Sequence, residues 1–389
     1  MTAPIVIVGA SAAGLGAASG LRDRGYDGPV VVVDPDRHLP YERPTLSKAY
    51  LRDLDGPPPT PVQDDRWDRL AVQRVHDRAV GLDVDGHRLL LAGDRTLSYR
   101  SLVVATGATP VRPRALDAPG VHVLRDATDA AALRRDLAAA SSVVVVGGGF
   151  LGTEVAAAAA LAGRRVTVVD PLPAPVSPLG RLVSDRVAAL HRSHGVDLRL
   201  GRSVTAVLDT GGIRGVVLDD GSTVLADVVL LALGVVPADD WLAGTAVRRD
   251  GGVVVDAHLR AAPDVLAAGD VARVFSPRYG QHLRVEHWTT ALGHGSLAAA
   301  VTLEGPSGGL EQELPYVWTE QYEARLCVLG RCAGLRSTVV EQHPDADRFV
   351  VAYTDAAGCL QGVLTWNWTR MLAPWRARIA AGMRLADVG

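Results

Sequence analysis

Lysine is almost absent from this sequence of 389 residues. Lys48 is the only lysine among the 40 basic residues, and all the others are arginine. The 43 acidic residues leave a formal net charge of -3, which argues against a nucleic-acid partner. No apolar run reaches the roughly 18 residues of a membrane helix, and the first residues lack the basic start of a signal peptide. We therefore expect a cytoplasmic protein with no membrane partner.

Cysteine is also scarce, and no metal-binding pattern replaces it. The three cysteines are Cys327, Cys332 and Cys359, and no two of them are spaced as CxxC. An odd number argues against a disulfide framework, so we interpret them as reduced thiols. His191 and His194 form an HxxH pattern on an expected helix, but no third ligand lies nearby. We predict a solvent-exposed helix face there and no metal.

Glycine, by contrast, is concentrated in two similar turns. The sequence GASAAG at residues 9–14 follows the β-branched run Ile5–Val8, and GGGFLG at residues 147–152 follows Val143–Val146. A helical stretch follows each turn. Such turns let the backbone approach a pyrophosphate at a helix N-terminus. The first copy departs from GxGxxG because Ser11 stands at the second glycine position. The repeat predicts two βαβ units that each bind a dinucleotide.

An aspartate ends the next strand of both units. Asp34 lies 20 residues past Gly14, and Asp170 lies 18 residues past Gly152. This is the spacing at which a carboxylate accepts hydrogen bonds from a ribose. Asp170 would repel the 2′-phosphate of NADP, so we expect the second unit to bind NAD.

The order of strands and helices predicts an α/β fold with three domains. Residues 1–108 and 235–312 are expected to form one discontinuous nucleotide-binding domain. Residues 109–234 are expected to form a second domain of the same Rossmann-like, three-layer kind. Residues 313–389 have shorter strands and a final helix, which indicate a smaller α+β domain at the C-terminus.

A further segment gives a specific resemblance. Tyr41-Glu42-Arg43-Pro44-Thr45-Leu46-Ser47-Lys48 is similar to the flavin-facing Arg-Pro-x-Leu-Ser-Lys segment of bacterial NADH:ferredoxin reductases, flavoproteins of the glutathione-reductase-like superfamily. Other similar segments extend over nearly the whole chain: Ala105-Thr106-Gly107, residues 147–152 with Glu154, Gly234-Val235-Val236-Pro237, Ala268-Gly269-Asp270, Glu286-His287-Trp288 and residues 315–322. The resemblance implies FAD in the first nucleotide-binding domain and NAD in the second.

The resemblance also implies three sets of cofactor contacts. The ADP half of FAD would lie against Gly9, Ser11, Ala12, Ala13, Gly14 and Asp34. The rest of FAD would lie against Arg43, Lys48, Ala105, Thr106, Gly107, Gly269, Asp270, Glu286, His287, Trp288 and Trp318. NADH would lie against Gly147, Gly149, Phe150, Leu151, Gly152, Glu154, Asp170 and Gly234. For the two tryptophans, packing in the apolar core is the alternative.

Lys48 has independent weight, because a sequence that otherwise uses arginine keeps an ammonium group at this position. Lysine is a compact point charge that the planar guanidinium of arginine does not imitate in a tight site. Our hypothesis is that Lys48 pairs with Glu154 near flavin N5 and stabilises the negative charge of the reduced flavin, which makes both residues candidates for catalysis.

The implied activity is hydride transfer from NADH to FAD, followed by transfer of single electrons to a [2Fe–2S] ferredoxin. That ferredoxin would supply a haem-thiolate monooxygenase or a Rieske oxygenase. Residues 44–50 contain no cysteine, so thiol relay chemistry is not expected. Two alternatives stay open: an NADH oxidase or reductase of a small acceptor, and a non-catalytic redox sensor resembling apoptosis-inducing factor. The assembly is expected to be a monomer or a homodimer.

Overall fold

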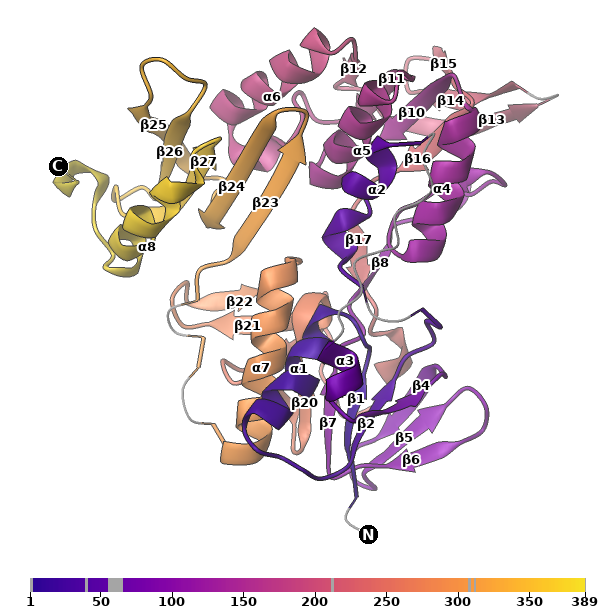
Figure 1. Cartoon of the computed structure of the whole chain (residues 1–389), viewed down its shortest axis with the longest axis vertical. Helices are drawn as coiled ribbons and strands as arrows, with labels where there is room; N and C mark the ends of the chain where they lie inside the picture. Colours follow the sequence, from indigo (N-terminus) through magenta and orange to yellow (C-terminus); the bar gives the residue numbers. More distant parts are fainter. Residues whose placement is uncertain are drawn as a thin grey trace. The chain divides into compact units, whose positions relative to one another are not determined.

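The chain folds into two compact units (Figure 1). The computed structural model describes residues 3–38, 41–54, 66–210, 213–306, 309–310 and 313–388. Unit 1 consists of Met1–Glu42, Val62–Thr109 and Val235–Glu313. Unit 2 consists of Arg43–Pro61, Pro110–Gly234 and Leu314–Gly389.

A twisted, mostly parallel sheet is the centre of unit 1. Its strand order is β19-β20-β7-β1-β2-β3, and only the edge strand β19 runs antiparallel to its neighbour. The central strands are runs of valine and isoleucine that are buried on both faces, as in other parallel sheets covered by helices. In chain order the strands are β1 (Ile5–Val8), β2 (Val30–Val33), β3 (Gln73–Val75), β7 (Ser101–Val104), β19 (Arg260–Ala262) and β20 (Val265–Ala267).

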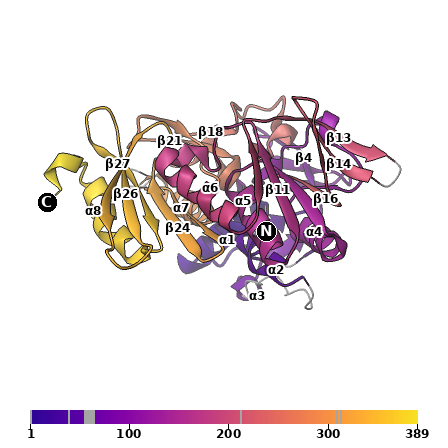
Figure 2. The same ribbon diagram turned by 90° about the horizontal axis from the view of Figure 1, so that it is seen from above.

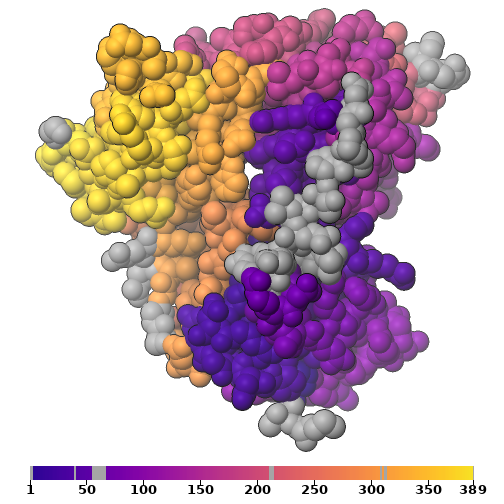
Figure 3. Space-filling model, in the orientation of Figure 1, coloured from indigo at the N-terminus to yellow at the C-terminus, as the bar shows by residue number. Residues whose placement is uncertain are grey.

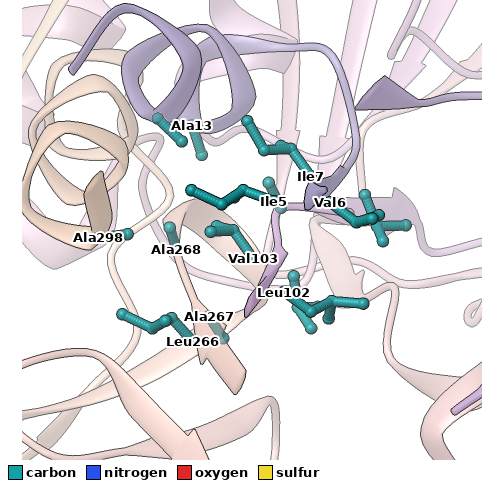
Figure 4. Packing of buried hydrophobic residues seen from close by; sticks show 14 of the residues in the cluster. Ile5, Val6, Ile7, Ala13, Leu102, Val103, Leu266, Ala267, Ala268 and Ala298 are labelled. Carbon is teal, nitrogen blue, oxygen red and sulfur yellow. The ribbon is translucent and has the colours of Figure 1, made fainter. Parts of the chain in front are cut away.

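Two long helices of unit 1, α1 (Ala12–Asp23) and α7 (Trp288–Glu304), lie side by side. Their backbones approach closely, because a Cβ added at Gly16 would collide with the carbonyl oxygen of Leu292 and one at Gly295 with that of Ala13. Figure 4 shows Ala13 and Ala298 among the apolar side chains that these helices and the sheet enclose. The tight helix pair covers one face of the parallel sheet.

Smaller sheets complete unit 1, with strand orders β4-β5-β6, β18-β21-β22 and β17-β8. Their strands are β4 (Ala79–Asp83), β5 (Arg88–Leu91), β6 (Thr96–Ser98), β8 (Ala108–Pro110), β17 (Val235–Pro237), β18 (Val253–Val255), β21 (Ala272–Ser276) and β22 (Gln281–Leu283). The short helical segments are α3 (Arg66–Arg69), η4 (Asp240–Leu242) and η5 (Gly269–Val271).

Unit 2 contains the second doubly wound sheet. Its strand order is β12-β11-β10-β16-β9, and every pairing in it is parallel. Figure 2 shows α4 and α5 beside this sheet. The strands are β9 (Val121–His122), β10 (Ser142–Val146), β11 (Arg165–Asp170), β12 (Asp197–Leu200) and β16 (Val228–Leu231). The helices are α4 (Ala127–Ala139), α5 (Phe150–Leu161) and α6 (Arg181–Ser193).

A three-stranded sheet of order β13-β14-β15 is added to this part of unit 2. Its strands are β13 (Val204–Thr210), β14 (Ile213–Leu218) and β15 (Thr223–Leu225). Val216 and Leu218 from this sheet pack with Val229 and Leu231 of β16, which joins the two sheets through one apolar core. Short helical segments η2 (Arg114–Leu116) and η3 (Ser177–Leu179) lie in the connections.

The C-terminal part of unit 2 is an antiparallel sheet of order β23-β24-β27-β26-β25. Trp375 of α8 is buried against one face, and Val183 and Val187 of α6 are buried against the other. The elements are β23 (Tyr316–Gln321), β24 (Ala324–Gly330), β25 (Arg336–Gln342), β26 (Phe349–Thr354), β27 (Leu360–Trp366), η6 (Thr369–Met371), α8 (Leu372–Ala380) and η7 (Leu385–Asp387).

The segment that follows Glu42 differs from the predicted domain division. It contains η1 (Arg43–Thr45) and α2 (Ala49–Arg52), and it belongs to unit 2 although we expected it in residues 1–108. The guanidinium of Arg134 on α4 donates to the carbonyl oxygen of Tyr50 at 2.6 Å, which anchors α2. Figure 3 shows this indigo segment between the orange and magenta parts of unit 2. The division into three domains otherwise stays a prediction.

The expected α/β class is confirmed by the two parallel sheets, and the α+β character of the C-terminal part is confirmed by its antiparallel sheet and α8. Within the described residues, no helix combines the length and the apolar character that a bilayer crossing requires.

Candidate functional site

The glycine turn of unit 1 connects β1 to α1. Gly9 has φ +112°, and a Cβ there would collide with the carbonyl oxygen of Ala105, so only glycine fits. Ser11, the departure from the glycine pattern, has φ -80° and ψ -159°, an extended conformation open to any residue. Its side chain makes no capping hydrogen bond. The serine is therefore compatible with a turn whose amide groups face an anion at the start of α1.

Asp34 closes this turn from the end of β2. Its Oδ2 accepts a hydrogen bond from the backbone N of Ala10 at 2.6 Å, and its Oδ1 accepts one from the backbone N of Asp36 at 2.8 Å. The carboxylate is thus held beside the glycine turn while it stays partly exposed. The residues predicted for the ADP half of FAD are therefore brought together in unit 1.

The glycine turn of unit 2 repeats this geometry between β10 and α5. Gly147 has the same φ of +112°, and a Cβ there would collide with the carbonyl oxygen of Ala232. Asp170 Oδ2 accepts from the backbone N of Gly148 at 2.5 Å, and Oδ1 accepts from the backbone N of Leu172 at 2.7 Å. A Cβ at Gly149 would meet no atom of the described residues within 4 Å, so this side of the turn is open toward them. The turn and its acid can hold a second dinucleotide.

Glu154 on α5 is held by two neighbouring residues of the segment before α2. Lys48 Nζ lies 2.8 Å from Glu154 Oε1, and Ser47 Oγ donates to Glu154 Oε2 at 2.5 Å. Lys48 also donates to the carbonyl oxygen of Pro44 at 3.2 Å. The side chains of Lys48 and Glu154 are only 12% and 6% exposed. The ion pair that we expected is present, and the catalytic role of its two members stays a prediction.

Other predicted FAD contacts lie in unit 1 where strands end. Thr106 Oγ1 donates to the carbonyl oxygen of Ala238 at 2.7 Å, and the carbonyl oxygen of Gly107 accepts from the backbone N of Ala238 at 3.0 Å. These two bonds join the segment of unit 1 that ends at Thr109 to the segment of unit 1 that begins at Val235. In η5, a Cβ at Gly269 would lie 2.9 Å from the Cβ of Ala13. The start of η5 is therefore close in space to the first glycine turn.

The segment before α7 contains a buried polar atom without a partner. His287 is the N-cap of α7, and its Nδ1 is buried with no hydrogen-bond partner among the described residues. Burial lowers the pKa of His287 to about 4, against the opposing charges of Asp270 and Glu313. Glu286 forms an ion pair with Arg284 at 2.6 Å. A neutral ring with a free nitrogen fits a site that accepts a polar ligand group.

Not all predicted residues lie in the unit where we expected FAD. Arg43 and Lys48 belong to unit 2. Trp318 on β23 lies in the C-terminal part, as expected, and stacks on Tyr316 with ring centroids 5.9 Å apart. Trp288 begins α7 and packs against the apolar core of unit 1, as the alternative interpretation allowed. Gly234 has φ +87° and its carbonyl oxygen accepts from the backbone N of Val111 in unit 2.

The prediction for HxxH was wrong at its first histidine. His191 is fully buried, and its Nε2 lies 3.0 Å from Gln321 Oε1, whereas we expected a solvent-exposed face. His194 is partly exposed and stacks on Tyr322 at 3.7 Å between ring centroids. Over the ranges given above, no three His, Cys, Asp or Glu side chains are arranged to hold a metal ion.

Three residues with clear structural roles were not predicted. Ser47 was quoted as part of the resemblance but given no role, although its position beside Lys48 was a usable signal. Thr153 and Gln321 form a buried hydrogen bond at 2.8 Å between α5 and β23. No pattern in the sequence pairs residues 168 positions apart, so that contact could be found only in the folded chain.

Comparison with known proteins gives matches along the chain. A family described as pyridine nucleotide-disulphide oxidoreductase matches residues 3–295, and a domain described as reductase C-terminal matches residues 316–388. The ferredoxin–NAD(+) reductase component of an anthranilate 1,2-dioxygenase system from Burkholderia cepacia is 36% identical over 97% of this chain and 94% of its own.

Solved structures agree with these matches. A ferredoxin reductase for the CYP199A2 system from Rhodopseudomonas palustris has a TM-score of 0.91 and 30% identity, over 99% of this chain and 96% of its own. The covalent complex of putidaredoxin reductase with putidaredoxin gives a TM-score of 0.89 and 28% identity, over 98% of this chain and 94% of the matched chain.

Proposed function

The chain belongs to the pyridine nucleotide-disulphide oxidoreductase family, and we propose that it transfers a hydride from NADH to FAD and then single electrons to a ferredoxin. FAD and NAD are the cofactors of this family. Two reductases that are similar to nearly the whole chain are named for ferredoxin reduction in oxygenase systems. The protein is thus an NAD(P)H-dependent flavoprotein oxidoreductase of the ferredoxin–NAD(+) reductase type.

One observation supports the proposal above all: the same anion-binding turn occurs twice. Gly9 and Gly147 share φ +112°, and each turn has an aspartate whose Oδ2 accepts from a backbone N of that turn. A single dinucleotide would require only one such turn. Two turns fit an enzyme that binds FAD and NAD at once and moves electrons between them.

The residues of this chain fit the two cofactors. The turn at residues 9–14 and Asp34 would hold the ADP half of FAD, and the turn at residues 147–152 and Asp170 would hold NAD. Asp170 is 7% exposed and fixed by two backbone N–H groups, so it would face the ribose hydroxyls as an anion and disfavour NADPH. FAD, when bound, supplies the conversion of a two-electron hydride into single electrons.

Lys48, Ser47 and Glu154 have a positioning and electrostatic role in this proposal. Glu154 orients the ammonium of Lys48, and Ser47 holds the second carboxylate oxygen in place. A fixed positive charge stabilises negative charge that develops nearby during the reaction. Residues 44–50 contain no cysteine, so the disulfide chemistry in the family description has no equivalent in this segment.

The finer identity of the partner is part of the proposal. We infer that the acceptor is a [2Fe–2S] ferredoxin that supplies a haem-thiolate monooxygenase or a Rieske oxygenase, and that the reductase acts in the cytoplasm as a monomer or homodimer. Two similar reductases are named for an anthranilate 1,2-dioxygenase system and for the CYP199A2 system, and these names support both kinds of oxygenase partner.

The decisive experiment is cytochrome c reduction by the purified FAD-loaded protein. NADH or NADPH is the electron donor, and a [2Fe–2S] ferredoxin encoded nearby is present or omitted. Reduction that depends on the ferredoxin supports the proposal. Equal consumption of NADH without it would instead indicate an oxidase, and slow reduction with a long-lived charge-transfer band would indicate a redox sensor.

A further inference from the structure

A chain of buried hydrogen bonds joins the C-terminal sheet to the second glycine turn. Gln321, the last residue of β23, is fully buried. Its Nε2 donates to Thr153 Oγ1 at 2.8 Å, and its Oε1 lies 3.0 Å from His191 Nε2. Thr153 is in the first turn of α5, and His191 is in the last turn of α6. One amide therefore links three elements of unit 2.

The chemistry of the donors and acceptors fixes the direction in which each of these hydrogen bonds is donated. An amide oxygen only accepts, so His191 donates from Nε2 and its Nδ1 is an acceptor. The hydroxyl of Tyr322 donates to that Nδ1 at 3.2 Å. Burial lowers the pKa of His191 to about 4, in keeping with a neutral ring. Both polar atoms of the ring and both ends of the amide are thereby hydrogen-bonded.

This series of hydrogen bonds ends at the backbone of the second glycine turn. The hydroxyl of Thr153 lies 2.8 Å from the carbonyl oxygen of Gly149 and 3.0 Å from that of Phe150, and it has one proton to donate between them. Gly149 is the N-cap of α5 and is open on its outer side. The peptide units fixed by Thr153 are therefore those whose amide groups would face a pyrophosphate.

We propose that Gln321 is a positioning residue for the nicotinamide dinucleotide. Through Thr153 it fixes the first turn of α5, and with it the direction of the amide groups in the glycine turn. A residue of the C-terminal sheet, outside residues 109–234, thus sets the affinity of the NAD site. The inference rests on the proposed function only in requiring that this turn binds NAD. Loss of one such hydrogen bond is expected to weaken binding about fivefold.

The test is binding of ADP-ribose to the FAD-loaded protein, measured by titration calorimetry. ADP-ribose contains the pyrophosphate and riboses but no nicotinamide, so binding is read without turnover. Gln321→Leu and Thr153→Val should each weaken binding about fivefold, and the double variant should be no weaker than either single one. Thr153→Ser retains the hydroxyl and should bind as the wild type does.

Thr365→Val is the matched control. Thr365 is fully buried in the same sheet, and its hydroxyl has no partner among the described residues. This variant should leave ADP-ribose binding unchanged, which separates general loosening of the sheet from loss of the specific link. If Gln321→Leu does not fold, Gln321→Met, which also removes the amide, takes its place, and Thr153→Val against Thr153→Ser tests the hydroxyl through which Gln321 acts.

Two results would overturn the inference. One is wild-type affinity in Gln321→Leu or, where that variant is not obtained, in Gln321→Met. The other is a double variant in which the two losses add, because residues that act through one bond cannot lose it twice. Ferredoxin-dependent reduction by the wild type is scored separately, so failure of the proposed acceptor and failure of this link give different patterns.

Discussion

Replacing Lys48 by arginine should slow the reduction of bound FAD by NADH about tenfold. The ammonium of Lys48 makes two contacts, at 2.8 Å to Glu154 Oε1 and at 3.2 Å to the carbonyl oxygen of Pro44. A guanidinium prefers to pair with both oxygens of a carboxylate. Oε2 of Glu154 is already occupied by Ser47, so arginine must displace that hydroxyl or give up its fork geometry.

The magnitude follows from the contacts that change. Arginine keeps the charge but loses the bond to Pro44 or forces out Ser47, and a hydrogen bond to a charged group is worth about 1.5–3 kcal/mol. The lower end corresponds to about a tenfold slower step. Lys48→Met also loses the charge, so its reduction should be about a hundredfold slower or more. Removing the competing hydroxyl, in Lys48→Arg with Ser47→Ala, should recover part of the arginine loss.

The assay is stopped-flow reduction at saturating NADH, followed by the loss of flavin absorbance. Arg52→Lys is the control. It exchanges the same two residue types in the reverse direction, on a side chain of α2 that is 41% exposed. A Lys48→Arg variant that reduces FAD at the wild-type rate would refute the electrostatic argument. So would a Ser47→Ala change that fails to improve the arginine variant.

Three further outcomes are expected. Asp170→Asn should lower the NADH-to-NADPH ratio of kcat/KM by about tenfold or more in steady-state assays, because a neutral amide no longer repels the 2′-phosphate, whereas Asp34→Asn should leave that ratio unchanged and weaken FAD retention. Gly149→Ala should keep the wild-type Tm, because the new Cβ has space, but it should raise the KM for NADH, because the Cβ occupies space that the pyrophosphate needs. Gly147→Ala should lower the Tm, because its Cβ would collide with the carbonyl oxygen of Ala232. Burial lowers the pKa of His191 from 6.5 to about 4, so the stability that its neutral ring contributes is present above pH 6.5 and is lost as the pH falls toward 4. The variant His191→Gln should therefore show a smaller fall of Tm between pH 6.5 and pH 4 than the wild type. An unchanged slope of Tm against pH would contradict this explanation.

The sequence predicts best where backbone geometry allows few residue types. The two glycine turns, the valine strands before them and the aspartates after them lie where we expected, because a φ of +112° and a parallel strand buried on both faces each restrict composition. The partnership of Lys48 with Glu154 was also found, because the rarity of lysine singled out Lys48 and the resemblance supplied Glu154. These features are local or depend on one unusual residue.

The sequence predicts less well where distant segments meet. The assignment of residues 43–54 to unit 2 depends on contacts of α2 with α4 and α5 that a local pattern does not contain. The burial of His191 did have a local signal, because it continues the buried stripe of Val183 and Val187 at intervals of four along α6. We gave more weight to histidine as a polar residue than to its position in that period, which explains the error.

The close approach of α1 to α7 has a consequence for how this protein is made. Gly16 of α1 lies against the carbonyl oxygen of Leu292, so this side of the first helix is covered by a segment that leaves the ribosome more than 270 residues later. In the meantime the nascent chain completes the second parallel sheet, from β10 to β16. The sheet of unit 1 thus receives α7 only after the second parallel sheet is complete and before the antiparallel sheet β23–β27 of unit 2 is made, and a fragment cut before α7 lacks that cover.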